Sequence, residues 1–84
     1  MSYRIIIVPS AEKELARLDH SLLHRLLKRI HLLEKEPRPH GVIKLTGIFA
    51  YRIRIGNYRV IYSIDDSAKC IRILRVAHRG ETYR

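Results

Sequence analysis

The spacing of apolar residues changes twice along the chain, and each change marks a different kind of element. Residues 3–8 form a short, isoleucine-rich run that stops at Pro9, which predicts a buried first strand. Apolar residues then recur every three or four positions, which predicts two helices separated near Asp19. From residue 50 the pattern becomes β again, and it predicts strands over roughly 50–55, 58–64 and 70–78.

Polar residues indicate where the two helices begin. Ser10 is placed to cap the first helix, and Glu12 and Glu14 fall in its first turn, where the helix dipole favours acids. The segment from Asp19 to Ser21 interrupts the pattern and can cap a second helix. The face of the second helix opposite its leucine stripe is basic, and it is either a solvated surface or an auxiliary phosphate contact. Its side chains are His24, Arg25, Lys28, Arg29, His31 and Lys35.

These elements predict one α+β domain over residues 1–84. Pro37 and Pro39 cannot continue a helix, so a loop connects the second helix to the later strands. The order is β-α-α-β-β-β. We expect a helical hairpin packed on a small twisted antiparallel sheet, because the helix pair returns the chain to the same edge and short turns join the later strands.

The segment from residue 51 to residue 62 reads as a β-hairpin with an anion-binding face. Gly56-Asn57 tolerates the positive φ of a tight turn. Side chains alternate along a strand, so Arg52 and Arg54 share one face, while Tyr51, Ile53 and Ile55 share the packed face. Other arginines can join the first face if the alternation brings them there. The candidates are Arg59, Arg72, Arg75 and Arg79.

The charge of the chain supports an anionic partner. The 84 residues include 17 Lys and Arg against 8 Asp and Glu, and the formal net charge is +9. Residues 42–84 hold nine of these cations and only three acids, so the charge is concentrated where the hairpin lies. Phosphate is the natural counterpart of such a surface, although a basic surface can also be merely solvated.

Several other chemistries find little support. The single cysteine, Cys70, lies in an apolar strand run and fits a core position, so nothing indicates secretion and we expect a cytoplasmic protein. No segment approaches the length of a membrane span. His20 and His24 have the spacing of two zinc ligands, but no third ligand follows, so we expect no metal or other cofactor. No glycine-rich phosphate loop and no serine or cysteine triad is evident.

Metal-independent phosphoryl transfer on RNA remains. The 2′-hydroxyl of RNA lies beside its own phosphate, so a protein can promote cleavage by aligning the two groups and stabilising the developing charge. Clustered guanidinium groups supply that stabilisation. Tyrosines can stack on unpaired bases.

The order and spacing of these residues resemble the RelE family of toxin–antitoxin pairs, within the RelE/ParE superfamily. The resemblance covers essentially the whole chain. It is carried by Ala11-x-Lys13-x-Leu15-x-x-Leu18, Pro39-x-Gly41-x-x-Lys44-Leu45-x-Gly47, Tyr51-Arg52-Ile53-Arg54, Gly56-x-Tyr58-Arg59-Val60-Ile61-Tyr62, and Val76-x-His78-Arg79 with Tyr83. It implies a RelE-like fold and an endoribonuclease that cuts messenger RNA in the ribosomal A site, leaving a 2′,3′-cyclic phosphate and a 5′-hydroxyl.

The resemblance also implies roles for individual residues. Arg52 and Arg54 match a basic pair that flanks the scissile phosphate. Arg59 matches the residue that stabilises the transition state, Arg79 the one on the leaving-group side, and Tyr83 a tyrosine that stacks on or orients the substrate.

This sequence departs from the best-known members of the family, which carry lysines at the first two of these positions. Arginine stays protonated in proteins, so Arg52 and Arg54 are charge clamps and the general base is open. The candidates are Tyr83, His78, or a group from the ribosome or the RNA. Strict alternation would aim His78 away from Arg79. Additional substrate contacts are expected from Lys44, Tyr51 and His78.

The resemblance implies partners and leaves rival functions open. The expected partners are an acidic, RelB-like antitoxin in a hetero-oligomer, the ribosome and messenger RNA, with no membrane partner. One rival is a ParE-like toxin that inhibits DNA gyrase by binding and cleaves nothing. The other is a plain RNA-binding module.

Overall fold

The structure is a computed structural model, and it describes residues 2–79. The two helices follow the first strand, and the remaining strands come afterwards, as the apolar pattern predicts. The elements are β1 (Arg4–Ile7), α1 (Pro9–Ala16), α2 (His20–Leu32), β2 (Ile43–Lys44), β3 (Tyr51–Ile55), β4 (Tyr58–Asp65) and β5 (Cys70–His78).

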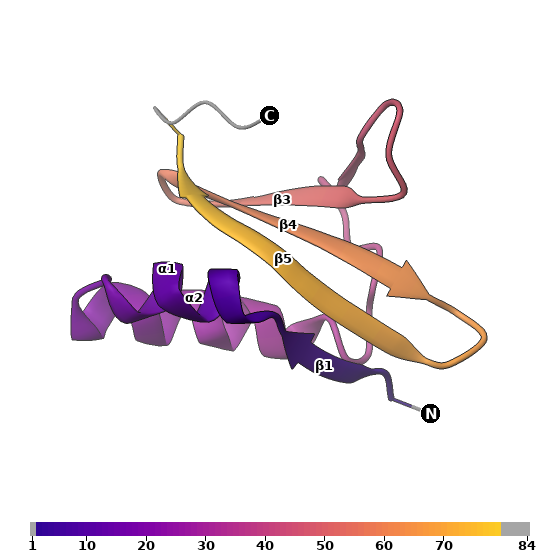
Figure 1. Ribbon diagram of the computed structural model, residues 1–84, viewed down its shortest axis with the longest axis horizontal. Helices are drawn as coiled ribbons and strands as arrows, with labels where there is room; N and C mark the ends of the chain where they lie inside the picture. The colour runs from indigo at the N-terminus through magenta and orange to yellow at the C-terminus, as the bar shows by residue number, and fades with distance from the viewer. Residues whose placement is uncertain (1, 80–84) are drawn as a thin grey trace.

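Both helices cover one face of a five-stranded sheet with the order β1-β5-β4-β3-β2 (Figure 1). This α+β layering confirms the predicted fold class. The sheet is mixed, however, because β1 pairs in parallel with β5 while all other neighbours are antiparallel. The expectation of a wholly antiparallel sheet is therefore wrong for one pair of strands.

The path of the helices explains the position of β1. The helical hairpin returns the chain to the end of the sheet where β1 began, but at the opposite edge, so β3 runs in the same direction as β1 (Figure 1). The last strand, β5, then lies between β1 and β4. The short β2 was expected to be loop; it pairs only through Ile43 with Arg52 and Lys44 with Tyr51.

The two helices start in different ways. Pro9 is in the first turn of α1, where its missing N–H costs nothing, and Val8 is the N-cap without a side-chain hydrogen bond. The prediction that Ser10 caps this helix is therefore wrong. In α2 the prediction is confirmed, because the Asp19 carboxylate accepts a hydrogen bond of 2.8 Å from the Leu22 N–H.

The core lies between the helices and the covered face of the sheet. The leucine stripe of α2 supplies Leu26 and Ile30, which are at most 2% exposed, and Ala11 and Leu15 come from α1. The sheet contributes its alternate residues, as the period of two requires. They are Ile53, Ile55, Val60, Tyr62, Ile71, Ile73 and Val76. Neither helix among residues 2–79 has the length and apolar character needed to cross a bilayer.

Candidate anion-binding site

The β3–β4 hairpin has the predicted turn and register. Gly56 adopts a φ of +60°, a conformation that glycine takes without strain. Ile55 pairs with Tyr58 directly across the turn. Because this register is fixed, Ile53 and Ile55 are buried, and Arg52 and Arg54 point to the other side of the sheet.

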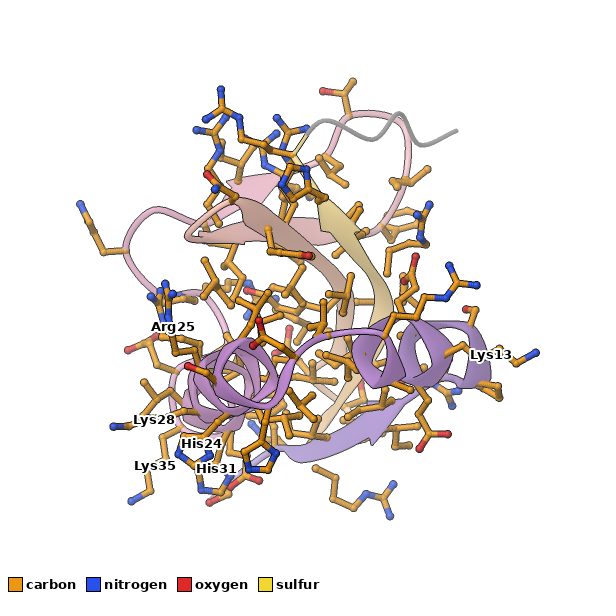
Figure 2. The ribbon with its side chains drawn as sticks, turned by 90° about the vertical axis from the view of Figure 1, so that its left-hand side faces the viewer. Lys13, His24, Arg25, Lys28, His31 and Lys35 are labelled. Carbon is orange, nitrogen blue, oxygen red and sulfur yellow. The ribbon has the colours of Figure 1, made fainter. Side chains whose placement is uncertain are left out.

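The strand register places five arginines on the face opposite the helices, and Arg79 continues the alternation directly after β5. We call this surface the arginine face. Arg54 pairs directly with Arg59, and Arg52 lies two residues before Arg54 on the same strand. In Figure 2 the helices lie below the β3–β5 part of the sheet and no helix of the described chain lies above it. The members of the arginine face are Arg52, Arg54, Arg59, Arg72, Arg75 and Arg79.

A β-bulge is needed to bring two of these arginines to the same face. Arg72 and Arg75 are three residues apart, so strict alternation would place them on opposite faces. Ile61 pairs with Arg75 whereas Tyr62 pairs with Ile73, which leaves Leu74 as an extra residue in β5. The extra residue reverses the alternation, and both arginines align with the hairpin arginines.

Glu14 of α1 holds the edge of the sheet beside this bulge. Its carboxylate accepts hydrogen bonds from Arg75 Nε at 2.9 Å and from the Val76 N–H at 2.7 Å. β1 pairs with β5 only as far as Ile73, so Glu14 continues the hydrogen bonding of β5 past the end of β1. From the sequence, Glu14 was expected only to interact with the helix dipole. Its contact with Arg75 joins residues that are 61 positions apart, so the local pattern does not indicate it.

The arginine face contains polar groups and charges that favour an anion. Arg54 and Arg59 are like charges directly opposite one another, an arrangement that destabilises a sheet unless an anion lies between or above them. Arg52 Nε is shielded from solvent and donates no hydrogen bond to any of residues 2–79. A buried donor of this kind costs free energy until it finds an acceptor, and a phosphate oxygen is a suitable one.

The end of β5 is fixed against the hairpin turn. The Arg79 N–H donates to the Asn57 carbonyl at 2.7 Å, which places Arg79 beside the β3–β4 turn. Continued alternation from Ala77 directs Arg79 toward the arginine face. Tyr83, the remaining predicted catalytic residue, lies outside the described residues.

Three predicted substrate contacts are placed on the helix side of the sheet instead. Lys44 pairs with Tyr51, so both belong to the face opposite the arginines. His78 pairs with Tyr58, and the two rings meet edge to face with centroids 5.3 Å apart. His78 therefore points away from Arg79, as the alternation predicted, and the structure does not bring these three residues together with the arginine face.

Tyr51 belongs to a polar cluster that fastens the connector between α2 and β2. Arg38 lies over the Tyr51 ring at 5.2 Å and forms an ion pair of 2.9 Å with Asp66 in the β4–β5 turn. The Tyr3 hydroxyl donates to the same carboxylate at 2.6 Å. The Tyr62 hydroxyl donates to the Pro37 carbonyl at 2.7 Å. Sequence reasoning missed this cluster, because its members come from five separate parts of the chain.

Electrostatics within the cluster follow from these contacts. Hydrogen bonds from Arg38 and Tyr3 lower the pKa of Asp66 to about 2. The same ion pair raises the pKa of Arg38, and burial raises the pKa of Tyr62. Among residues 2–79, no three histidine, cysteine or acidic side chains come together in a way that could hold a metal ion.

Comparisons with known proteins agree with the fold and with the family that the sequence resembles. The family described as "ParE toxin of type II toxin-antitoxin system, parDE" matches residues 5–83. Toxin RelG of Mycobacterium tuberculosis is 33% identical over 88 residues, covering 100% of this chain and 99% of that protein. Toxin RelE of the same organism is 31% identical over 90 residues, covering 98% and 87%.

Solved structures show the same arrangement of helices and sheet. The toxin in the archaeal RelE–RelB complex from Pyrococcus horikoshii superimposes with a TM-score of 0.85 at 40% identity, covering 98% of this chain and 100% of that chain. The isolated Escherichia coli RelE toxin has a TM-score of 0.81 at 23% identity, covering 95% and 87%, a likeness of fold alone.

Together these findings define a toxin of the RelE/ParE superfamily. Within that superfamily the chain belongs to the RelE family, and it is the toxin of a toxin–antitoxin pair. RelE-family toxins are known as endoribonuclease-type toxins.

Proposed function

We propose that this toxin is a metal-independent endoribonuclease that cuts messenger RNA in the ribosomal A site and so inhibits translation. The observation that carries the proposal is the arginine face, where Arg54 and Arg59 lie directly opposite one another and Arg52 has a buried, unsatisfied Nε. A phosphodiester in the middle of this group would accept hydrogen bonds from several guanidinium groups and relieve their mutual repulsion.

Each arginine has a distinct role in the proposed reaction. The RNA 2′-oxygen attacks the adjacent phosphorus, the bond to the 5′-oxygen breaks, and a 2′,3′-cyclic phosphate and a 5′-hydroxyl form. Arg52 and Arg54 hold the phosphate in line, and Arg59 stabilises the charge that develops on its oxygens. Arg79, beside the turn, stabilises the leaving 5′-oxygen, which takes its proton from water. Tyr83 stacks on or orients the substrate.

The proton of the 2′-hydroxyl goes to a base that these arginines cannot provide, because guanidinium groups stay protonated. Tyr83 and a group of the ribosome or the RNA are the remaining candidates. The side of the sheet on which His78 lies argues against that residue. A base supplied by the ribosome would make cleavage depend on the ribosome.

An acidic antitoxin is the proposed inhibitor of this activity. Related toxins have been solved as RelE–RelB complexes from Pyrococcus horikoshii and as RelBE2 from Mycobacterium tuberculosis. The net charge of +9 favours a partner of opposite sign, which would neutralise the arginine face in a hetero-oligomer.

Translation in a purified system tests the proposal. We expect new messenger 5′ ends at codons in the A site when the toxin is added, and no cleavage of the same RNA without ribosomes. Cleavage of naked RNA but not of ribosome-bound RNA would contradict the proposal, as would an absence of cleavage by a folded toxin.

The match to the ParE toxin family favours a second candidate, a toxin that binds DNA gyrase and cleaves nothing. A supercoiling assay separates the two functions. Under the main proposal the toxin leaves gyrase activity unchanged at concentrations that stop translation, and under the alternative the two outcomes are exchanged.

A further inference from the structure

The outer face of α2 carries a row of basic side chains that the proposed chemistry does not use. His24, Lys28, His31 and Lys35 follow one another at intervals of four, three and four residues, which aligns them along one side of a helix. Lys35 lies in the turn after α2. Figure 2 shows these four side chains together on the side of α2 that faces away from the sheet. We call them the basic spine.

Helix stability alone does not account for the basic spine. α2 contains no Asp or Glu between His20 and Leu32, so Lys28 has no acidic neighbour within the helix. Within residues 2–79, neither Lys28 nor Lys35 forms an ion pair, and the spine's only acidic contact joins His31 to Glu34 at 3.2 Å. Cations near the last turn complement the helix dipole, but Lys28 lies before that turn.

The neighbouring arginines extend this charge on one flank. Arg29 is exposed beside Lys28. Arg25 points toward the hairpin turn, where its guanidinium lies 3.1 Å from the place that a β-carbon on Gly56 would occupy. Arg25 therefore has a packing role, whereas Lys28 and Lys35 of the basic spine are exposed and form no ion pair within residues 2–79.

The side chains of the basic spine suit a rigid polyanion better than a protein segment. Protein interfaces need buried apolar anchors. The exposed leucines of α2, Leu27 and Leu32, lie on opposite flanks of the helix with the spine between them, so no apolar side chain interrupts the row of basic residues. α2 also lacks Phe, Tyr and Trp, the side chains on which unpaired bases stack. Double-stranded RNA is instead recognised by its shape and by contacts to phosphates and 2′-hydroxyls.

We propose that the basic spine of α2 is a second RNA-binding surface, which holds the backbone of double-helical RNA while the arginine face holds the single strand. The two surfaces are on opposite sides of the molecule, because the core separates α2 from the arginine face (Figure 2). The protein would therefore lie between a helical RNA element and the strand that it cuts. The proposal uses the proposed function only in taking RNA as the partner.

Binding measurements test the spine without requiring cleavage. The probes are a fluorescent RNA duplex of about 16 base pairs, close to the span of one double-stranded-RNA-binding domain, and a single strand of the same length. Lys28→Gln should lower the slope of log affinity against log salt for the duplex by about 1, and adding Lys35→Gln should lower it by about 2. Affinity for the single strand should change less than affinity for the duplex.

Lys13→Gln is the matched control. Lys13 is an exposed lysine of α1 that points away from the spine, on the other side of the helical layer (Figure 2). The Lys13→Gln variant loses the same charge as Lys28→Gln. We expect its slope of log duplex affinity against log salt to equal that of the unaltered toxin. Lys28→Arg keeps the charge and should restore binding. Thermal melts of each variant separate a loss of binding from a loss of fold.

Two results of these binding measurements would refute RNA binding by the basic spine. Equal losses in the Lys13 and Lys28 variants would overturn the proposal, since the charge would then act without regard to position. Duplex binding that is unchanged in the double variant, Lys28→Gln with Lys35→Gln, would also overturn the proposal. This holds as well if the double variant binds an acidic protein more weakly while it still binds the duplex. A toxin that cleaves nothing but binds duplex through the spine would refute the proposed function and uphold the spine.

Discussion

Arg54 and Arg59 face one another across the β3–β4 hairpin, and their positions could be read from the sequence because alternation and a glycine turn are local signals. The partners of Arg75 and Arg38 could not be read in the same way. Glu14 is 61 residues from Arg75, and Asp66 is 28 residues from Arg38. Nothing in their own segments distinguishes these acids from solvated ones.

Asp66 should make the stability of the toxin depend on pH in the acid range. Its folded pKa of about 2 lies below the value of about 3.9 for an unfolded aspartate. A lowered pKa stabilises the fold above the unfolded value, and this contribution is lost as pH falls from about 4 through 2. Asp66→Asn should therefore flatten the fall in the free energy of unfolding across that window, as measured by urea titration at several pH values.

A suitable control for this measurement is Glu36→Gln. Glu36 is exposed and its side chain forms no hydrogen bond or ion pair with any of residues 2–79. This variant should follow the unaltered toxin through the same pH window. If Asp66→Asn shows the same pH dependence of the free energy of unfolding as the unaltered toxin, the contacts of Asp66 with Arg38 and Tyr3 do not form in solution.

At the scale of elements, the apolar pattern predicted the helices, the main strands and their order, since each periodicity extends over a whole segment. It failed at three places where tertiary contacts decide the result. β1 pairs in parallel with β5, Leu74 forms a bulge, and α1 begins at Pro9 rather than after Ser10. Each of these three features depends on which segment packs beside the strand or helix. The residues of that strand or helix alone do not determine it.

The helix caps provide a test at this scale. Asp19→Ala removes the hydrogen bond to the Leu22 N–H and should lower the free energy of unfolding by about 1 kcal/mol. Ser10→Ala should change it by less than about 0.5 kcal/mol, because Ser10 lies inside α1 and caps nothing. Chemical denaturation measures both. A larger loss for Ser10→Ala than for Asp19→Ala would mean that Ser10 is the N-cap and that α1 begins at Ala11 rather than at Pro9.

Glu14 should stabilise the junction between α1 and β5. Glu14→Ala leaves the Val76 N–H and Arg75 Nε without this acceptor, and we expect a loss of about 2 kcal/mol in the free energy of unfolding. Glu12→Ala, an exposed acid in the same helix, should cost less than about 1 kcal/mol. Hydrogen exchange at the Val76 amide should rise only in the first variant, and equal exchange in both would contradict the assigned contact.

The whole molecule separates its charge onto two sides of one small core. The arginine face lies on the uncovered side of the sheet, and the basic spine lies on the outer side of α2 (Figure 2). Composition alone predicted a phosphate partner, but the fold decides which cations act together. The same fold placed Lys44, Tyr51 and His78 away from the arginine face, although all three were expected to contact the same substrate.

The central claim is that the arginine face cleaves messenger RNA on the ribosome, and the most direct test compares Arg59→Ala with Lys13→Ala. The quantity to measure is the rate at which new messenger 5′ ends form in programmed ribosomes, with both variants first shown to melt like the unaltered toxin. Loss of the transition-state arginine should slow cleavage by at least about 100-fold. Lys13→Ala, remote from that face, should cleave at the unaltered rate. Equal rates for Arg59→Ala and Lys13→Ala would contradict the account.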